Sequence, residues 1–268
     1  MPVRCFDDLS GRQSGDGRIN VVLSHGFGTD QDAWSALRPW LDAHFRVTSF
    51  DLPGCGQNGA QSYDFRRHSS MYGYADDLLT VLEELGIEDC IYIGHSMSCM
   101  IGAAAACTRP DWFREIVMIG GSPRYLNDGD YHGGFERADL DGLFDSMAAN
   151  FQAWVAGFAP MVVGVEDNAA IEEFSRTLFA MRPDIALATS RTIFESDMRA
   201  LLPKLKTPTH IVQTAQDMAV PVAVGEWLHD AIPRSTLEII DATGHLPHMT
   251  AVPQIQAMLE RRLGAFAA

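Results

Sequence analysis

The stretch from Ile91 to Gly102 constrains the fold of this chain more than any other part of the sequence. It reads Ile-Tyr-Ile-Gly-His-Ser-Met-Ser-Cys-Met-Ile-Gly and predicts a short buried strand, a sharp turn with Ser96 at its apex, and a helix of small residues that continues through Ala106. A tight turn of this kind lifts the serine hydroxyl clear of the sheet. The stretch therefore predicts a nucleophile elbow, which displays a serine for chemistry.

The elbow also places a backbone donor next to that serine. The N–H of Met97 would point from a helix N-terminus toward a negatively charged oxygen forming at Ser96. The usual pattern is G-x-S-x-G, and Ser98 stands in place of the last glycine here. Alone, the pattern also fits a serine that merely caps a helix. The buried run before it and the Ala-rich helix after it favour the nucleophile.

A second backbone donor is expected from an earlier turn. Residues 19–24 read as a buried strand and lead directly into His25-Gly26-Phe27-Gly28. A glycine-rich turn after an early strand is where enzymes with this elbow place their other oxyanion donor. We assign that donor to the N–H of Phe27, which would face Met97 across the reacting carbonyl. The alternative is an ordinary turn between a strand and a helix.

Strands alternate with helices along the chain, which predicts an α/β fold with a doubly wound, mostly parallel sheet. Residues 57–70 are polar and predict a surface loop, and Asp51 is expected to pin the loop that follows it through hydrogen bonds to backbone N–H groups. The expected strands are residues 19–24, 45–50, 91–93, 113–121, 209–214 and 236–240, and the expected core helices include residues 32–43, 71–85 and 253–263.

The pattern changes over residues 124–197, where no strand is expected. Apolar and aromatic residues recur every three or four positions over residues 140–158, which predicts one amphipathic helix, and residues 171–179 and 183–194 predict two more. Helices inserted between two core strands form a cap over the carboxyl ends of the strands, where Ser96 would emerge. We therefore expect one domain over the whole chain, with a cap at residues 124–197.

Packing between cap helices accounts for most of the aromatic residues in this segment. Four of them, Phe135, Trp154, Phe158 and Phe194, are predicted to face the nucleophile and make an apolar substrate pocket. His95 neighbours the nucleophile and is expected to shape the same pocket.

Ser96, Asp217 and His245 form a candidate catalytic triad. A serine hydroxyl needs a base to take its proton, and that base must be held in one tautomer. Asp217 follows one predicted strand and His245 follows the last one, so all three side chains would converge above the sheet. The competing acid position, after the strand of residues 113–121, holds no carboxylate. Acyl transfer from an ester or lactone is the chemistry that this triad predicts.

Other reactive residues near the triad have simpler interpretations. His95 is too constrained by the elbow to be the base, and Cys99 is expected to be a small packed helix residue. His248 lies three residues after His245, but no further ligands accompany the two histidines as a metal site would require. We expect neither a metal nor an organic cofactor.

Composition narrows the function classes. A formal charge of −15 at pH 7 argues against nucleic acid and anionic membranes as partners, because both favour basic proteins. Residues 1–17 lack the apolar core of a signal peptide, and no apolar run is long enough to span a membrane. The five cysteines show no C-x-x-C spacing. We therefore expect a cytoplasmic protein with reduced thiols.

Longer motifs occur over nearly the whole chain, and those of the cap are far more specific than the elbow. They are His25–Gln31, Gly94–Ser98, Ser122–Asp128, Gly157–Pro160, Glu173–Phe179, Met181–Ile185 and Gly244–Pro247. Together they resemble the strigolactone and karrikin receptor hydrolases of plants, to which the bacterial stress regulator RsbQ is related. Ser98 in place of glycine agrees with that group.

This resemblance implies an α/β-hydrolase fold with a four-helix cap and a deep apolar pocket. It implies a slow, monomeric hydrolase that binds or cleaves a butenolide and passes a conformational signal to a protein partner. The pocket residues implied for this chain are Phe27, His95, Tyr125, Phe135, Leu143, Trp154, Phe158 and Phe194.

Two other functions stay open. The chain would be a regulatory binding protein in the manner of RsbQ, with little turnover and a partner that docks on the cap around Glu172–Asp184. Alternatively it would be a catabolic esterase, lactonase or carbon–carbon bond hydrolase. The predicted pocket offers little positive charge to hold a substrate carboxylate, which disfavours the last of these.

Overall fold

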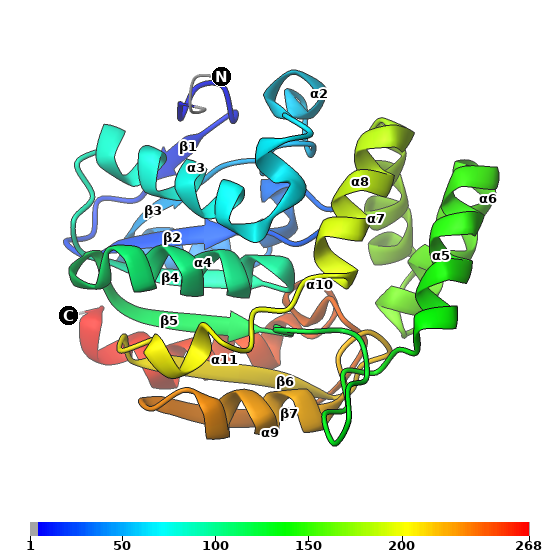
Figure 1. Ribbon diagram of the computed structural model, residues 1–268. Helices are drawn as coiled ribbons and strands as arrows, with labels where there is room; N and C mark the ends of the chain where they lie inside the picture. Colours follow the sequence, from blue (N-terminus) through cyan, green and yellow to red (C-terminus); the bar gives the residue numbers. More distant parts are fainter. Residues whose placement is uncertain (1–4, 268) are drawn as a thin grey trace.

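Apolar runs rich in Val and Ile form the central strands of one sheet (Figure 1). A computed structural model describes residues 5–267. Its strand order is β1-β3-β2-β4-β5-β6-β7, and β1 pairs antiparallel with β3 whereas the other pairs are parallel. The predicted α/β class with a mostly parallel sheet is confirmed. The strands are β1 (Arg12–Ser14), β2 (Asn20–Ser24), β3 (Arg46–Ser49), β4 (Cys90–His95), β5 (Phe113–Ile119), β6 (Thr209–Gln216) and β7 (Ser235–Thr243).

Helices follow most strands. They are α1 (Arg38–His44), α2 (Gly59–Ser62), α3 (Met71–Glu84), α4 (Met97–Thr108), α5 (Arg137–Ala149), α6 (Phe151–Val163), α7 (Asn168–Ala180), α8 (Pro183–Phe194), α9 (Val222–Ala231), α10 (Pro247–Thr250) and α11 (Val252–Leu263). Short 3₁₀ helices are η1 (Gln31–Trp34), η2 (Arg67–Ser69), η3 (Pro110–Trp112), η4 (Leu202–Lys204) and η5 (Gly264–Phe266). Within the described part of the chain, no helix has both the length and the apolar character that crossing a membrane requires.

Both faces of the sheet are covered, which leaves the ends of its strands for a functional site. Successive side chains of β4 point to opposite faces. Ile91 and Ile93 pack in the core cluster that includes α1 and α11, whereas Tyr92 packs in the cluster with α3, α4 and α9. Strands buried on both faces read as continuous apolar runs, which explains why β4 shows no alternation of apolar and polar residues.

Four helices stand beyond the ends of the strands, on the side to which the strand arrows point in Figure 1. They are α5 to α8, which lie between β5 and β6 in the chain. We call residues 124–197 the cap. In Figure 1, α5 and α6 form one pair of neighbouring ribbons and α7 and α8 lie closer to the sheet.

The prediction of one helix over residues 140–158 is wrong, because Asn150 ends α5 and begins α6. Its backbone is extended (φ −155°, ψ 92°), and its side chain accepts a hydrogen bond from the N–H of Ala153 at 3.0 Å. Asparagine favours this capping role over a helix interior. The apolar spacing continues across the break, so periodicity alone does not reveal it.

The prediction of one helix over residues 32–43 is also wrong. A 3₁₀ turn, η1, precedes the shorter helix α1. Pro39 lies in the first turn of α1, where its missing N–H costs nothing, whereas in the interior of a longer helix it would remove a hydrogen bond and clash. Proline therefore determines where α1 begins.

The surface loop predicted for residues 57–70 is instead partly helical and partly buried. The His68 side chain is fully buried, and its Nε2 donates to Oδ2 of Asp77 at 2.8 Å. The N–H of Asp64 donates to Nδ1 of His68, and Nε of Arg67 donates to Oδ1 of Asp77. Asp77 lies on the buried face of α3, so this polar segment is held to the core by a carboxylate that periodicity does not single out.

Removal of the Asp77 carboxylate is expected to destabilise the protein by about 3–5 kcal/mol, because His68 and Arg67 lose their shared partner inside the fold. In thermal melts, Asp77→Ala should therefore unfold about 10 °C below the parent chain. The matched control is Asp76→Ala, an exposed position on the same helix, where the change should stay within about 0.5 kcal/mol. Equal melting temperatures for the two variants would contradict a stabilising role of this buried pair.

Candidate active site

Ser96 occupies a strained turn between β4 and α4. Its backbone has φ 56° and ψ −122°, a conformation that residues other than glycine rarely adopt. The strain is held by neighbours, because the N–H of Ser96 donates to the carbonyl of Ile119 on β5 at 2.9 Å. Met97 is the first residue of α4. The turn thus presents the serine at the carboxyl edge of the sheet.

Ser96, His245 and Asp217 lie in one hydrogen-bonded chain. Nε2 of His245 lies 2.9 Å from Oγ of Ser96, and Nδ1 of His245 lies 2.7 Å from Oδ2 of Asp217. A carboxylate only accepts, so Nδ1–H donates to Asp217 and leaves the Nε2 lone pair facing the serine hydroxyl. This is the tautomer in which the imidazole can take the serine proton.

The surroundings of Asp217 favour the ionised form of its carboxyl group. Burial alone would raise the pKa of its carboxyl, but the His245 imidazole and the backbone N–H groups of Ala219 and Val220 hold that pKa below its ordinary value. Oδ1 accepts from these two N–H groups at 2.8 and 3.1 Å. The carboxylate therefore has both oxygens occupied and one fixed orientation toward His245.

The turn after β2 touches the elbow. A Cβ built on Gly26 would lie 2.5 Å from Nδ1 of His95 and 3.1 Å from Cβ of Ser96, so a side chain here would clash with the elbow. The carbonyl of Gly26 accepts from Nδ1 of His25 at 2.8 Å and from Oγ1 of Thr29 at 2.9 Å. Because a trans peptide is planar, these bonds also orient the N–H of Phe27 on the opposite side. Among the described residues, the N–H groups of Phe27 and Met97 donate to no other group.

Three further buried histidines, His25, His95 and His248, lie near the triad. Burial lowers the pKa of His25 and His95, and it lowers the pKa of His248 to about 3, so all three rings stay neutral. Nε2 of His95 donates to the carbonyl of His245 at 2.7 Å, and the ring of His95 packs against that of His248 at 4.3 Å. His95 therefore supports the His245 loop from below. Among these rings, only His245 is hydrogen-bonded to Ser96.

Alternative chemistry at the site finds no support in side-chain placement. The thiol of Cys99 is fully buried and donates to the carbonyl of Gly94 at 3.2 Å, and burial raises its pKa. The prediction that Asp51 pins the loop after it is wrong, because its Oδ1 accepts instead from the N–H of Gln31, earlier in the chain, at 3.0 Å and so holds η1. Within residues 5–267, no three His, Cys, Asp or Glu side chains are grouped as metal ligands.

An apolar cavity opens onto Ser96 and His245. Four of the predicted residues line it, namely Phe27, Tyr125, Phe158 and Phe194. Burial raises the pKa of Tyr125, so its hydroxyl stays protonated. The lining also contains Val162, Phe174, Ile193, Ala219 and Leu246.

Four other predicted pocket residues do not line this cavity. Trp154 stacks on Phe158 with ring centroids 4.5 Å apart, and Phe135 packs edge-on against Phe194 at 5.7 Å, so both lie behind lining residues. Leu143 is half-buried against the hydrophobic core. His95 lies below the site, as described above.

The lining residues that sequence reasoning missed carry only weak signals. Val162 lies one helical turn after Phe158, and Leu246 and Ile193 are direct neighbours of predicted site residues. Phe174 belongs to a motif of the resemblance, but its placement depends on how α7 packs on the core. Such positions follow from tertiary packing, which periodicity within one helix does not report.

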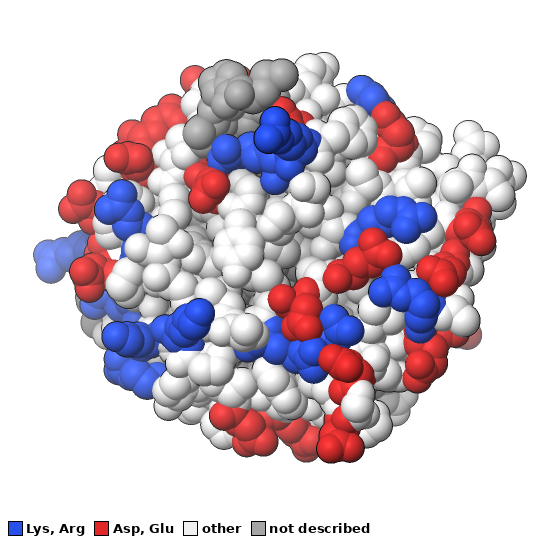
Figure 2. Space-filling model, viewed as in Figure 1, with Lys and Arg blue, Asp and Glu red and all other residues white. Residues whose placement is uncertain are grey.

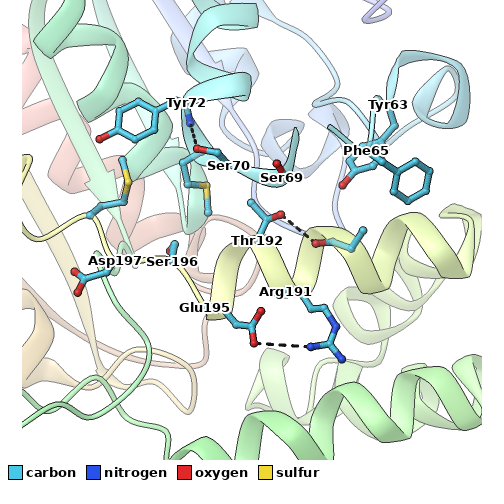
Figure 3. Close-up of a pocket in the computed structure, with 13 residues that line it drawn as sticks. Tyr63, Phe65, Ser69, Ser70, Tyr72, Arg191, Thr192, Glu195, Ser196 and Asp197 are labelled. Carbon is cyan, nitrogen blue, oxygen red and sulfur yellow. Dashed lines mark hydrogen bonds and ion pairs between the residues drawn. The ribbon is translucent and has the colours of Figure 1, made fainter. Parts of the chain in front are cut away.

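A second, open cavity of about 480 Å³ lies on the other side of α8 (Figure 3). Phe65 and Tyr72, each about half exposed, line one wall, and Arg191 of α8 and Glu195, directly after α8, line the other. On the face of the molecule drawn in Figure 2, acidic and basic side chains lie next to one another around a neutral central area. Neither histidine nor cysteine is among the described residues that line this groove, and its two carboxylates, Glu195 and Asp197, are both paired with arginines.

Comparison with known proteins agrees with this geometry. A family model described as the alpha/beta hydrolase fold matches residues 19–252. The chain is 48% identical to a karrikin insensitive 2 receptor of Petunia hybrida, over 93% of each chain, and 46% identical to the strigolactone esterase D14 of Arabidopsis thaliana, over 96% of this chain and 97% of the relative. A hydrolase from Oleispira antarctica superimposes with a TM-score of 0.94 at 36% identity, covering 97% of this chain and 96% of that one. The resemblance inferred from the motifs is confirmed.

Proposed function

The chain belongs to the α/β-hydrolase family, and we propose that it is a serine hydrolase that cleaves a small apolar ester or lactone bound next to Ser96. The observation that carries the proposal is the hydrogen-bonded chain from Ser96 through His245 to Asp217, which opens onto an apolar cavity. His245 is buried at the cavity wall and held in the tautomer that can take a serine proton, which is the arrangement that acyl transfer requires.

The reaction begins with attack of the Ser96 hydroxyl oxygen on the carbonyl carbon of the substrate. The serine proton passes to Nε2 of His245, and Asp217 stabilises the imidazolium that forms. The electron pair of the carbonyl moves to its oxygen, which the N–H groups of Phe27 and Met97 are positioned to bind. Collapse of this intermediate breaks the ester bond, and the leaving oxygen takes the proton from Nε2.

Water completes the cycle. His245 takes a proton from a water molecule while the water oxygen attacks the acyl group on Ser96. The same proton passes to the Ser96 oxygen when the acid leaves. In a lactone the leaving oxygen stays tethered to the acyl group, so one ring-opened acid is released. Both steps use the same donors and the same base.

The substrate class follows from the cavity and from the relatives. The side chains of Phe158, Phe174 and Phe194 offer apolar surface and no positive charge, which favours a neutral ligand. The names of the relatives, strigolactone esterase and karrikin receptor, support a butenolide. The cavity has a volume of about 30 Å³, well below the roughly 300–1,000 Å³ of ordinary ligand pockets, so a butenolide must displace lining side chains or the cap to enter.

The test is the intact mass of the protein after incubation with a synthetic strigolactone analogue, with Ser96→Ala in parallel. We expect a cleaved product or a covalent ligand fragment with the parent chain and neither with the variant. Hydrolysis of a simple aryl acetate without reaction of the analogue would keep the triad and replace the butenolide by another small ester. Inertness toward both compounds would overturn the enzyme proposal in favour of a binding protein.

We further propose that the chain acts as a cytoplasmic monomer and that a protein partner docks on the cap around residues 172–184. Free thiols support a reducing compartment, and the receptor names of relatives support signalling. In this segment Phe179 is about half exposed, and Arg182 forms an exposed ion pair with Asp184. Sedimentation should give the mass of one chain, and a substitution at Phe179 should spare hydrolysis while weakening partner binding.

A further inference from the structure

Helix α7 of the cap rests directly on the turn that carries Phe27. The hydroxyl of Thr177 donates to the carbonyl of Gly28 at 2.5 Å, and both groups are buried. That hydroxyl has one proton and two other acceptors in its own helix, the carbonyls of Phe174 at 3.0 Å and Glu173 at 3.2 Å. The Gly28 carbonyl is the nearest of the three, so the bond crosses from the cap to the core.

Packing at the same place leaves the turn little freedom. Gly28 has φ +76°, and a Cβ added there would lie 2.5 Å from Cδ2 of Leu178 and 3.0 Å from Cε2 of Phe174. Only glycine fits both the left-handed backbone and this close approach. The ion pair of Asp30 with the exposed Arg176 is long, at 3.8 Å, and contributes little beside these buried contacts.

The contact lies next to the expected oxyanion donor. Gly26 to Thr29 form a turn closed by the N–H of Thr29 on the carbonyl of Gly26. The carbonyl of Gly26, before Phe27, is held by groups of the core, whereas the carbonyl of Gly28, after Phe27, is held by the cap. The Phe27 N–H shares its peptide plane with the Gly26 carbonyl, so the core bonds set its direction, and the cap bond restrains the other end of the same turn, two peptides further on.

We propose that Thr177 is a positioning residue for the oxyanion hole, so that the seating of α7 on the core controls the rate of acyl transfer at Ser96. The inference rests on the proposed function. Thr177 does not line the cavity and touches no reacting atom. It acts through the Gly28 carbonyl on the orientation of the Phe27 N–H.

The cap also holds the base. The N–H of His245 donates to the carbonyl of Val162 on α6 at 2.9 Å. Phe174 of α7 and Val162 of α6 both line the catalytic cavity. The oxyanion turn and the His245 loop are therefore both hydrogen-bonded to cap helices that line the cavity.

The experiment compares Thr177→Val, which keeps the shape and removes the hydroxyl, with Thr177→Ser, which keeps the hydroxyl. Thr192→Val is the matched control. Thr192 on α8 also donates its hydroxyl to a core carbonyl, that of His68 at 3.0 Å, but His68 is not part of the turn from Gly26 to Thr29. The substrate is p-nitrophenyl acetate, assayed well below the melting temperature of each variant. Thr177→Ala serves as a second variant if the valine does not fold.

We expect Thr177→Val to lower kcat about tenfold with unchanged KM, because a displaced donor costs less than the roughly 10²–10³-fold loss on removing one. Thr177→Ser and Thr192→Val should stay within about twofold of the parent chain. The inhibition constant of phenylboronic acid should rise by the same factor as kcat falls, since its tetrahedral adduct on Ser96 also places an oxygen at the oxyanion donors.

The outcomes separate this inference from the proposed function. A parent chain that is inactive, or whose activity survives Ser96→Ala, would overturn the proposed function. A parent chain whose activity depends on Ser96, with Thr177→Val folded and at parental kcat, would overturn the role of Thr177 alone. That role would also be overturned if Thr192→Val loses as much activity as Thr177→Val, because any cap-to-core hydroxyl would then have the same effect.

Discussion

Ser96→Ala is expected to lower kcat for p-nitrophenyl butyrate by roughly 10⁵-fold, because loss of the nucleophile removes the whole acyl-transfer route and leaves only binding and electrostatic effects. His245 lies 2.9 Å from the missing hydroxyl and cannot replace it as the group that is acylated. The measurement is steady-state hydrolysis with the uncatalysed rate subtracted. KM loses its meaning in such a variant, so ligand binding is measured separately.

Two comparisons make this result specific. Ser146→Ala, an exposed serine of α5, should retain parental activity. Ser96→Gly should lose as much activity as Ser96→Ala. It should melt at a higher temperature than Ser96→Ala, because glycine adopts φ 56° without the strain of about 1–3 kcal/mol that alanine has there. Substantial activity in Ser96→Ala would show that another residue is the nucleophile.

Asp217→Asn is expected to lower kcat roughly 10³- to 10⁴-fold while the fold stays intact. The carboxylate accepts Nδ1–H of His245, whereas an amide nitrogen facing Nδ1 would favour the other tautomer. In that tautomer Nε2 carries a proton and cannot take one from Ser96. The lowered pKa of Asp217 means that the parent carboxyl is ionised throughout the neutral range, so the comparison at pH 7 isolates this effect.

The control is Asp241→Asn, an exposed position on β7, which should retain parental activity. Because the triad acts as a unit, the double variant Ser96→Ala, Asp217→Asn should be no less active than Ser96→Ala alone. Independent, multiplying losses in the double variant would contradict a shared mechanism for the two residues.

The elbow and the order of strands and helices were accessible from the sequence because they depend on near neighbours in the chain. The strand before Ser96, the turn and the helix after it all lie within the stretch from Ile91 to Gly102. Buried apolar runs also marked β2, β5 and β6 to within a few residues. Helix breaks were harder, since Asn150 interrupts an apolar spacing that continues across it.

The residues that line the cavity could be predicted from the sequence only in part. Apolar spacing shows which face of a cap helix is buried, but a buried face can meet a cavity or another side chain. Phe158 and Phe194 meet the cavity, whereas Trp154 and Phe135 meet those two rings. The choice depends on how the cap helices sit on one another and on the core, which no single helix encodes.

The sequence by itself determined the α/β class, the elbow and the candidate triad residues in their order along the chain, because turn residues and hydrophobic runs act over short distances. Only the tertiary structure decided which groups from distant segments touch. Thr177 lies 149 positions from Gly28, as Ser96 does from His245, yet each pair is hydrogen-bonded. Such contacts form because the cap and the strand ends must bury their apolar faces against each other, and that packing involves the whole chain at once.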